Sequence, residues 1–168
     1  NLGYITALML KYVFPYASLR VFGAVEEKLS YFTFAAGAYH VDADIGGMRV
    51  DHAFECVGGS DSAAAVNQII GLIKPEGTVA LLGVSETDVP LNTRLILEKG
   101  LRVFGSSRSG KADFVSAVEL MRQYPEIPRY LVNLVGDVVE VRSIRDIHRA
   151  FELESKRSFG KTALVWNT

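Results

Sequence analysis

The chain has 168 residues, 49% hydrophobic and 22% charged, which is enough apolar material for one domain with a hydrophobic core. The formal net charge is −1 and the lysines and arginines are scattered, so we expect neither a nucleic-acid partner nor a membrane partner. The single cysteine, Cys56, excludes an internal disulfide and suits a cytoplasmic protein, and no apolar stretch is long enough to span a bilayer.

Hydrophobic periodicity predicts helices and strands that alternate along the chain. Apolar residues at helical spacing predict a first helix from Gly3 to Phe14, which Pro15 ends. Further helices are expected at 26–36, at 62–74 with Ser62 as N-cap, from about Asn92, and at 111–124. Strands are expected at 18–25, 38–42, 51–58, 76–84 and 101–107. Apolar strands alternating with helices are typical of an α/β, Rossmann-type, doubly wound parallel sheet.

A glycine, Gly3, lies where the first helix begins. In a Rossmann unit the last glycine of GxGxxG has this place, because it lets the helix pack closely on the first strand. We therefore expect a sheet truncated at the N-terminus, without its first strand and part of GxGxxG, in which the second and fourth strands do not pair. A glycine at a helix start is also a common turn residue, which leaves a purely structural role open for Gly3.

Glycine-rich or polar segments follow four of the predicted strands: FGAVEEKL, FECVGGSDS, LLGVSE and FGSSRSG. In a parallel sheet of this kind the ligand binds at the carboxyl ends of the strands, so these segments predict a cofactor groove. An alternative is that these glycines only form turns. Turn formation explains any one of the four segments, but it explains all four together less well.

Several motifs, in this order and at these distances, resemble the cofactor domain of zinc-dependent medium-chain alcohol dehydrogenases: DHAFECVGG, IKPEGTVALLGVSE, VPLNTRLILEKGLRVFGSSRSG and VRSIRDIHRAF. Within that superfamily they are most similar to the ribulose-5-phosphate reductases, also called ribitol-5-phosphate dehydrogenases. The resemblance implies NADPH-dependent reduction of ribulose 5-phosphate to ribitol 5-phosphate for CDP-ribitol, teichoic acid or capsule synthesis. Two alternatives stay open: another zinc-dependent alcohol or polyol dehydrogenase, and a non-catalytic Rossmann module that binds a nucleotide or S-adenosylmethionine.

The resemblance also implies which residues bind the cofactor. It places Gly3 at the pyrophosphate turn, Gly83 and Val84 under the nicotinamide ring, Cys56 and Val57 along the groove, Ser106 and Arg108 near the nicotinamide amide, and Lys161 near the pyrophosphate. Glycine at position 83 would leave room for the flat ring. Cys56 has an alternative as a core residue, Lys161 as a solvated strand-edge residue, and Arg108 as a partner of Asp113. Arg108 is also a candidate to bind the substrate phosphate, because its guanidinium donates two hydrogen bonds at once.

Cofactor choice depends on the end of the second strand of the expected fold. NAD-binding units carry an acidic residue there for the ribose 2′-hydroxyl, and this chain has Gly23. We therefore expect NADPH in preference to NADH. Ala24 and Val25 follow, where NADP-binding relatives commonly have a basic or hydroxyl residue. Lys28 would reach the 2′-phosphate from the next helical turn, or form only surface pairs within EEKL.

The zinc ligands of the resembled family belong to an N-terminal catalytic domain that this chain lacks. His40, His52 and His148 have no ligand spacing, so we predict no metal and no catalytic residue in this chain. The expected organisation is a nucleotide-binding domain at 1–124 and a C-terminal segment at 125–168 that packs toward the absent domain. We expect this chain alone to be inactive, and the intact enzyme to be a homo-oligomer acting on a pentose phosphate.

Overall fold

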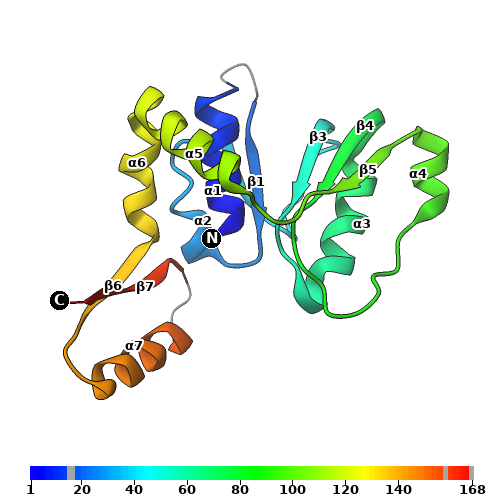
Figure 1. Ribbon diagram of the computed structural model, residues 1–168. Helices are drawn as coiled ribbons and strands as arrows, with labels where there is room; N and C mark the ends of the chain where they lie inside the picture. The colour runs from blue at the N-terminus through cyan, green and yellow to red at the C-terminus, as the bar shows by residue number, and fades with distance from the viewer. Residues whose placement is uncertain (15–17, 157–158, 167–168) are drawn as a thin grey trace. The chain divides into compact units, whose positions relative to one another are not determined.

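The computed structural model describes residues 1–14, 18–156 and 159–166 (Figure 1). The chain divides into two compact units. The central unit comprises Asp44–Asp113, and the terminal unit comprises Gly3–Ala43 and Phe114–Thr168. The described strands form three parallel sheets, with the orders β1-β2, β3-β4-β5 and β6-β7.

The terminal unit contains the first two strands and the last two. Its elements are α1 (Leu2–Tyr12), β1 (Arg20–Gly23), α2 (Glu26–Leu29), β2 (Gly37–His40), α6 (Glu126–Leu131), η2 (Val132–Leu134), β6 (Val135–Val141), α7 (Ile144–Lys156) and β7 (Lys161–Trp166). Between β1 and β2 the parallel register runs from Arg20 opposite Gly37 to Gly23 opposite His40. The carboxyl ends of these two strands therefore lie side by side.

The core of the terminal unit is built around the aromatic ring of Tyr4, which is 1% exposed. The rings of Phe32, Phe34 and Phe159 meet it edge-on, at centroid distances of 5.2, 5.5 and 5.4 Å. The Tyr4 hydroxyl accepts a hydrogen bond from Asn133 Nδ2 at 2.9 Å. Edge-to-face packing is a favoured arrangement of aromatic rings, and here it joins segments far apart in the sequence.

The central unit is a three-stranded parallel sheet with its connecting helices. Its elements are β3 (Val50–Glu55), η1 (Gly59–Asp61), α3 (Ser62–Leu72), β4 (Ile73–Leu81), α4 (Thr93–Lys99) and β5 (Arg102–Gly105), and α5 (Lys111–Gln123) follows. Leu81 of β4 lies opposite Glu55 on one side and Gly105 on the other. This register brings the carboxyl ends of all three strands to one edge of the sheet.

The parallel sheets and their helices confirm the expected α/β fold class. The second and fourth strands of the expected Rossmann order are β1 and β3, and in the described part of the chain they belong to separate sheets, as predicted. The predicted helices at the start of the chain and at 111–124, and the one after Asn92, are present as α1, α5 and α4. Pro15, expected to end the first helix, lies outside the described residues.

Three local expectations are wrong. The helix expected at 26–36 is only the four residues of α2, because both Phe32 and Phe34 pack on Tyr4, and residues two apart face different sides of a helix. Ser62 is the first residue of α3 rather than its N-cap, and it is buried. The strand expected at 76–84 instead runs over β4, from Ile73 to Leu81, since Val50 of β3 pairs with Ile73.

Candidate functional site

The residues expected to bind a cofactor in the central unit gather at the carboxyl edge of its sheet. Cys56 and Val57 follow β3, Gly83 and Val84 follow β4, and Ser106 and Arg108 follow β5. The parallel register places these loops next to one another. The sequence pattern therefore located this edge correctly as a convergence of strand ends.

Glu55, which sequence reasoning did not single out, is the organising side chain of this edge. Its carboxylate is at the end of β3, and the residue is 2% exposed. Oε1 accepts hydrogen bonds from the backbone N–H groups of Val57 at 2.7 Å and Gly58 at 2.9 Å. Oε2 accepts one from the N–H of Gly83 at 3.2 Å. One buried carboxylate thus joins the loop after β3 to the loop after β4.

Packing within the protein requires a glycine at position 83. A Cβ atom at this position would lie 2.6 and 2.7 Å from the two carboxylate oxygens of Glu55, and would also collide with the backbone nitrogen of Gly58. The space beside Gly83 is therefore filled by the protein's own groups. The expected place of Gly83 under a nicotinamide ring stays a prediction.

Two valines make this edge apolar on its exposed side. Val57 is 58% exposed and Val84 is 81% exposed. Their loops are in direct backbone contact, because the N–H of Gly59 donates to the carbonyl oxygen of Val84 at 2.8 Å. Gly58 has φ of 67°, and a Cβ there would lie 2.7 Å from the Val84 carbonyl oxygen, so the approach of the loops depends on glycine.

Cys56 and Ser106 are the first residues after β3 and β5. Cys56 is half-buried, and its Sγ lies 3.9 Å from the carbonyl oxygen of Phe54, so it is not part of the fully buried core. The backbone N–H of Ser106 donates to the carbonyl oxygen of Leu81 at 3.4 Å, while the residue is exposed. Ser106 therefore continues the pairing of β5 with β4 at the surface.

Arg108 is exposed and has φ of 69°, an uncommon backbone conformation for a residue other than glycine. The alternative in which it pairs with Asp113 is not seen. Asp113 instead accepts a hydrogen bond from the N–H of Gly110 at 2.7 Å, at the start of α5. Within the described ranges no ion pair involves Arg108.

In the terminal unit, three expected residues lie at or just beyond the end of β1. Gly23 is its last residue, Ala24 follows, and Lys28 is in α2. His40, at the end of β2, was missed: its Nε2 lies 3.2 Å from the carbonyl oxygen of Ala24. The N–H of Asp42 donates to His40 Nδ1 at 3.3 Å, which leaves the proton on Nε2 to bond Ala24. Nothing in the sequence signals this link.

Gly3 and Lys161 are the remaining expected residues. Gly3 lies in the first turn of α1, as the motif predicts. Lys161 Nζ lies 2.7 Å from Glu154 Oε1, and the N–H of Thr162 donates to Glu154 Oε2 at 2.8 Å. These hydrogen bonds lower the pKa of Glu154 to about 2. The structure thus pairs Lys161 within the terminal unit, in line with the strand-edge alternative.

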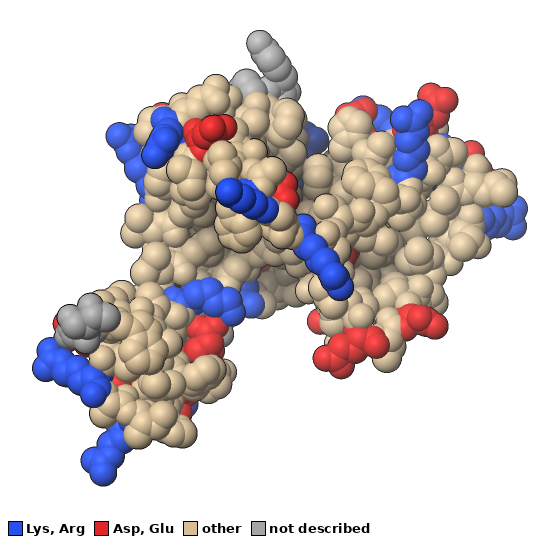
Figure 2. Space-filling model, viewed as in Figure 1, with Lys and Arg blue, Asp and Glu red and all other residues tan. Residues whose placement is uncertain are grey.

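Three further properties concern metal ligands, membrane-spanning helices and basic surface patches. In the part of the chain that the structure describes, no three His, Cys, Asp or Glu side chains form a group able to hold a metal ion, so these residues do not fit a zinc centre. No described helix is long and apolar enough to cross a membrane. On the face shown in Figure 2, neither unit gathers its basic side chains into one patch.

Known proteins resemble this chain over its whole length. The chain is 49% identical to ribulose-5-phosphate reductase 1 of Staphylococcus aureus (strain NCTC 8325 / PS 47) and 48% identical to ribulose-5-phosphate reductase of Bacillus spizizenii (strain ATCC 23059 / NRRL B-14472 / W23), each over 166 residues. Both alignments cover 99% of this chain and 49% of the relative. The chain thus spans about half the length of the curated relatives it matches.

Solved structures agree with these alignments. The crystal structure of S. aureus TarJ in complex with NADPH matches with a TM-score of 0.97 and 49% identity, over 100% of this chain and 53% of that chain. 2R,3R-butanediol dehydrogenase from Bacillus subtilis has a TM-score of 0.73 at 18% identity, over 98% of this chain and 48% of that chain, which shows a shared fold. The family model described as zinc-binding dehydrogenase matches residues 17–123, more than half of the chain. The chain therefore belongs to the zinc-binding dehydrogenase family.

Proposed function

We propose that this chain is the cofactor-binding half of an NADPH-dependent reductase that converts ribulose 5-phosphate to ribitol 5-phosphate. The observation that carries the proposal is its 49% identity, over 99% of its length, to a ribulose-5-phosphate reductase. The TM-score of 0.97 to TarJ in complex with NADPH supports the choice of cofactor. The product would supply CDP-ribitol for teichoic acid or capsule synthesis.

The carboxyl edge of the central sheet is suited to a nicotinamide. Val57 and Val84 expose apolar side chains on adjoining loops, a surface that matches the flat face of an aromatic ring. Cys56 and Ser106 lie beside them at the same strand ends. When bound, NADPH would supply the hydride, and the chain's own residues would orient the ring and keep water from the face they cover.

The end of β1 supports NADPH rather than NADH. Gly23 places no carboxylate at the position that would bind the ribose 2′-hydroxyl of NADH, so a 2′-phosphate meets no repulsion there. Lys28 lies one helical turn beyond, and among the described residues it forms no ion pair. We assign Lys28 to the 2′-phosphate, and Gly3, at the start of α1, to the pyrophosphate.

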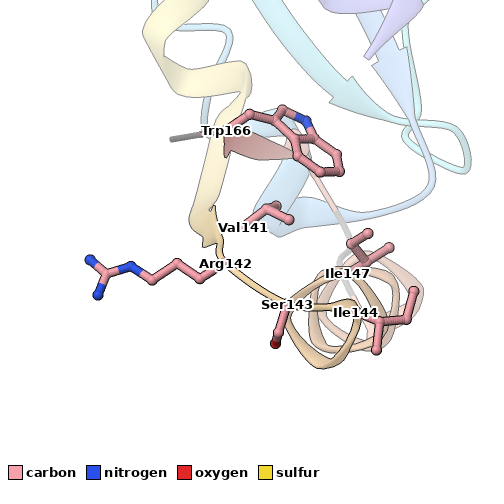
Figure 3. Close-up of a pocket in the computed structure, with 6 residues that line it drawn as sticks. All are labelled: Val141, Arg142, Ser143, Ile144, Ile147 and Trp166. Atoms are coloured by element: carbon pink, nitrogen blue, oxygen red, sulfur yellow. The ribbon is translucent and has the colours of Figure 1, made fainter. Parts of the chain in front are cut away.

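We also propose that residues 125–168 pack against the other half that the longer relatives have. Val141, Arg142, Ser143, Ile144, Ile147 and Trp166 line a pocket of about 560 Å³ (Figure 3). Ile144 on α7 is 66% exposed and Trp166 on β7 is 60% exposed, which suits an apolar surface that a neighbouring domain covers. That other half would hold the zinc. We further propose that the intact enzyme is a homo-oligomer.

The test uses the protein at its natural length and follows the oxidation of NADPH on addition of ribulose 5-phosphate. Substrate-dependent oxidation with formation of ribitol 5-phosphate is the expected result. Turnover with an unphosphorylated polyol, but none with ribitol 5-phosphate or ribulose 5-phosphate, would instead identify another dehydrogenase of the family. NADPH binding without turnover of any carbonyl substrate would identify a non-catalytic module.

A further inference from the structure

Glu55 is the one charged side chain among the buried residues of the described chain, and the proposed function gives it no role. Each of its carboxylate oxygens accepts a backbone hydrogen bond: Oε1 from the loop after β3, and Oε2 from the loop after β4. The backbone carbonyl oxygen of Glu55 accepts a further bond from the N–H of Gly83 at 3.1 Å. Glu55 therefore links these two loops through both its main chain and its side chain.

We propose that Glu55 is a positioning residue for the nicotinamide ring. By holding the N–H groups of Val57 and Gly83 on one carboxylate, it fixes the spacing of the two exposed valines, Val57 and Val84, on which the ring would lie. This inference rests on the proposed function, since it concerns the same site. Glu55 acts through the loops and is not itself assigned a contact with the cofactor.

The chemistry of the carboxylate suits this task. All three N–H groups need an acceptor, and an ionised carboxylate offers acceptors on both oxygens, whereas an amide would turn its NH₂ group toward one of the donors. An apolar side chain would leave the donors unsatisfied in the interior. Removing a carboxylate from water costs free energy, and an apolar side chain would often stabilise a fold as well. A carboxylate at this position therefore indicates that the two loops must keep a defined geometry.

Two glycines complete the arrangement. A Cβ at Gly83 would lie 2.6 Å from Glu55 Oε1, and a Cβ at Gly58 would lie 2.7 Å from the carbonyl oxygen of Val84. Both loops are therefore shaped to close around the carboxylate. Because the N–H of Gly59 also donates to Val84 at 2.8 Å, a change at Glu55 is transmitted directly to the exposed valine.

The test compares two ligands on the protein at its natural length. NADPH carries a nicotinamide, and 2′-phospho-ADP-ribose is the same molecule without it. For Glu55→Gln we expect the dissociation constant of NADPH to rise about tenfold, which is about 1.4 kcal/mol, and that of 2′-phospho-ADP-ribose to change less than about twofold. Equal losses for both ligands, or no loss for either, would overturn the positioning role.

A matched control is Glu119→Gln, which changes an exposed glutamate on α5 and should leave both dissociation constants unaltered. If Glu55→Gln does not fold, Glu55→Asp is measured in the same way, because it keeps the charge but shortens the reach by one methylene. The same selective loss is expected, and equal losses would again overturn the inference. Failure of the proposed function is distinguishable, because it is read on the unaltered protein: either it binds neither ligand, or it binds NADPH without reducing ribulose 5-phosphate.

Discussion

The ends of β3 and β4 and the ends of β1 and β2 are alike in topology but differ in how they are held. In each pair the strands are parallel, and one side chain bonds the loop of its neighbour. Between β3 and β4 the link is Glu55, which is 2% exposed and accepts hydrogen bonds from three backbone N–H groups. Between β1 and β2 it is His40, whose side chain is 34% exposed and which makes one bond to Ala24.

The different strengths that we expect of these two links follow from their burial. Breaking a buried link leaves hydrogen-bonding groups unsatisfied, whereas water replaces a more exposed link at little cost. On the proposed function the two ends also have different tasks. Hydride transfer requires the nicotinamide to be held within a fraction of an ångström, while the adenosine phosphate end only has to bind. On this proposal, the buried link at Glu55 lies beside the nicotinamide.

The most disruptive change to the edge that Glu55 holds should be Gly83→Ala. The added Cβ meets Glu55 and the backbone of Gly58, so we expect a loss of about 3 kcal/mol in the free energy of unfolding, the upper end for overpacking. Gly105→Ala is the matched control, since a Cβ there is 3.7 Å from the Leu81 carbonyl oxygen, an ordinary contact. Urea denaturation measures both, and equal small losses would show that the clash relaxes.

Arg108→Ala asks whether the exposed side of this edge binds the substrate phosphate. We expect a loss of about 1.5 to 3 kcal/mol in binding ribulose 5-phosphate, the range for a hydrogen bond to a charged group, with the affinity for NADPH nearly unchanged. KM for the sugar phosphate and the dissociation constant of NADPH give the two values. A loss confined to NADPH, or equal losses for ribulose and ribulose 5-phosphate, would exclude this role.

His40→Ala breaks the exposed link between β2 and Ala24. Because water can replace the imidazole, we expect a loss of only about 0.5 kcal/mol in the free energy of unfolding, the low end for a hydrogen bond. Thermal unfolding of the variant beside Gly83→Ala measures the contrast directly. A loss as large as that of Gly83→Ala would remove the distinction between the two pairs of strand ends.

A second side-chain link, the ion pair between Glu154 and Lys161, joins α7 to β7. The pKa of Glu154 is lowered from 4.5 to about 2 by Lys161 and the N–H of Thr162, so its stabilising contribution is complete above pH 4.5 and is lost as the pH falls toward 2. Lys161→Met should raise this pKa, as followed by NMR of the carboxylate carbon. If Lys161 moves to the pyrophosphate when NADPH binds, the pKa of Glu154 should rise on addition of NADPH as well. A pKa unaffected by NADPH would leave Lys161 in its ion pair.

The sequence was sufficient to predict the fold class and the edge of the sheet where glycine-rich loops converge, because hydrophobic periodicity and strand-end glycines are local patterns. It was not sufficient for contacts that depend on packing. A signal for Glu55 existed, an acidic residue at a strand end followed by CVGG, but its partner Gly83 is distant in sequence. The short α2 and the link from His40 to Ala24 likewise depend on tertiary contacts that no periodicity records.

The cofactor preference of the reaction tests the central claim most directly. With the protein at its natural length, initial rates are measured with ribulose 5-phosphate and either NADPH or NADH, and again with this chain alone. We predict turnover at natural length with kcat/KM at least about tenfold higher for NADPH, about 1.4 kcal/mol of transition-state stabilisation, and no turnover by the chain alone. Equal or better use of NADH, or no reduction of ribulose 5-phosphate with either cofactor, would contradict the account.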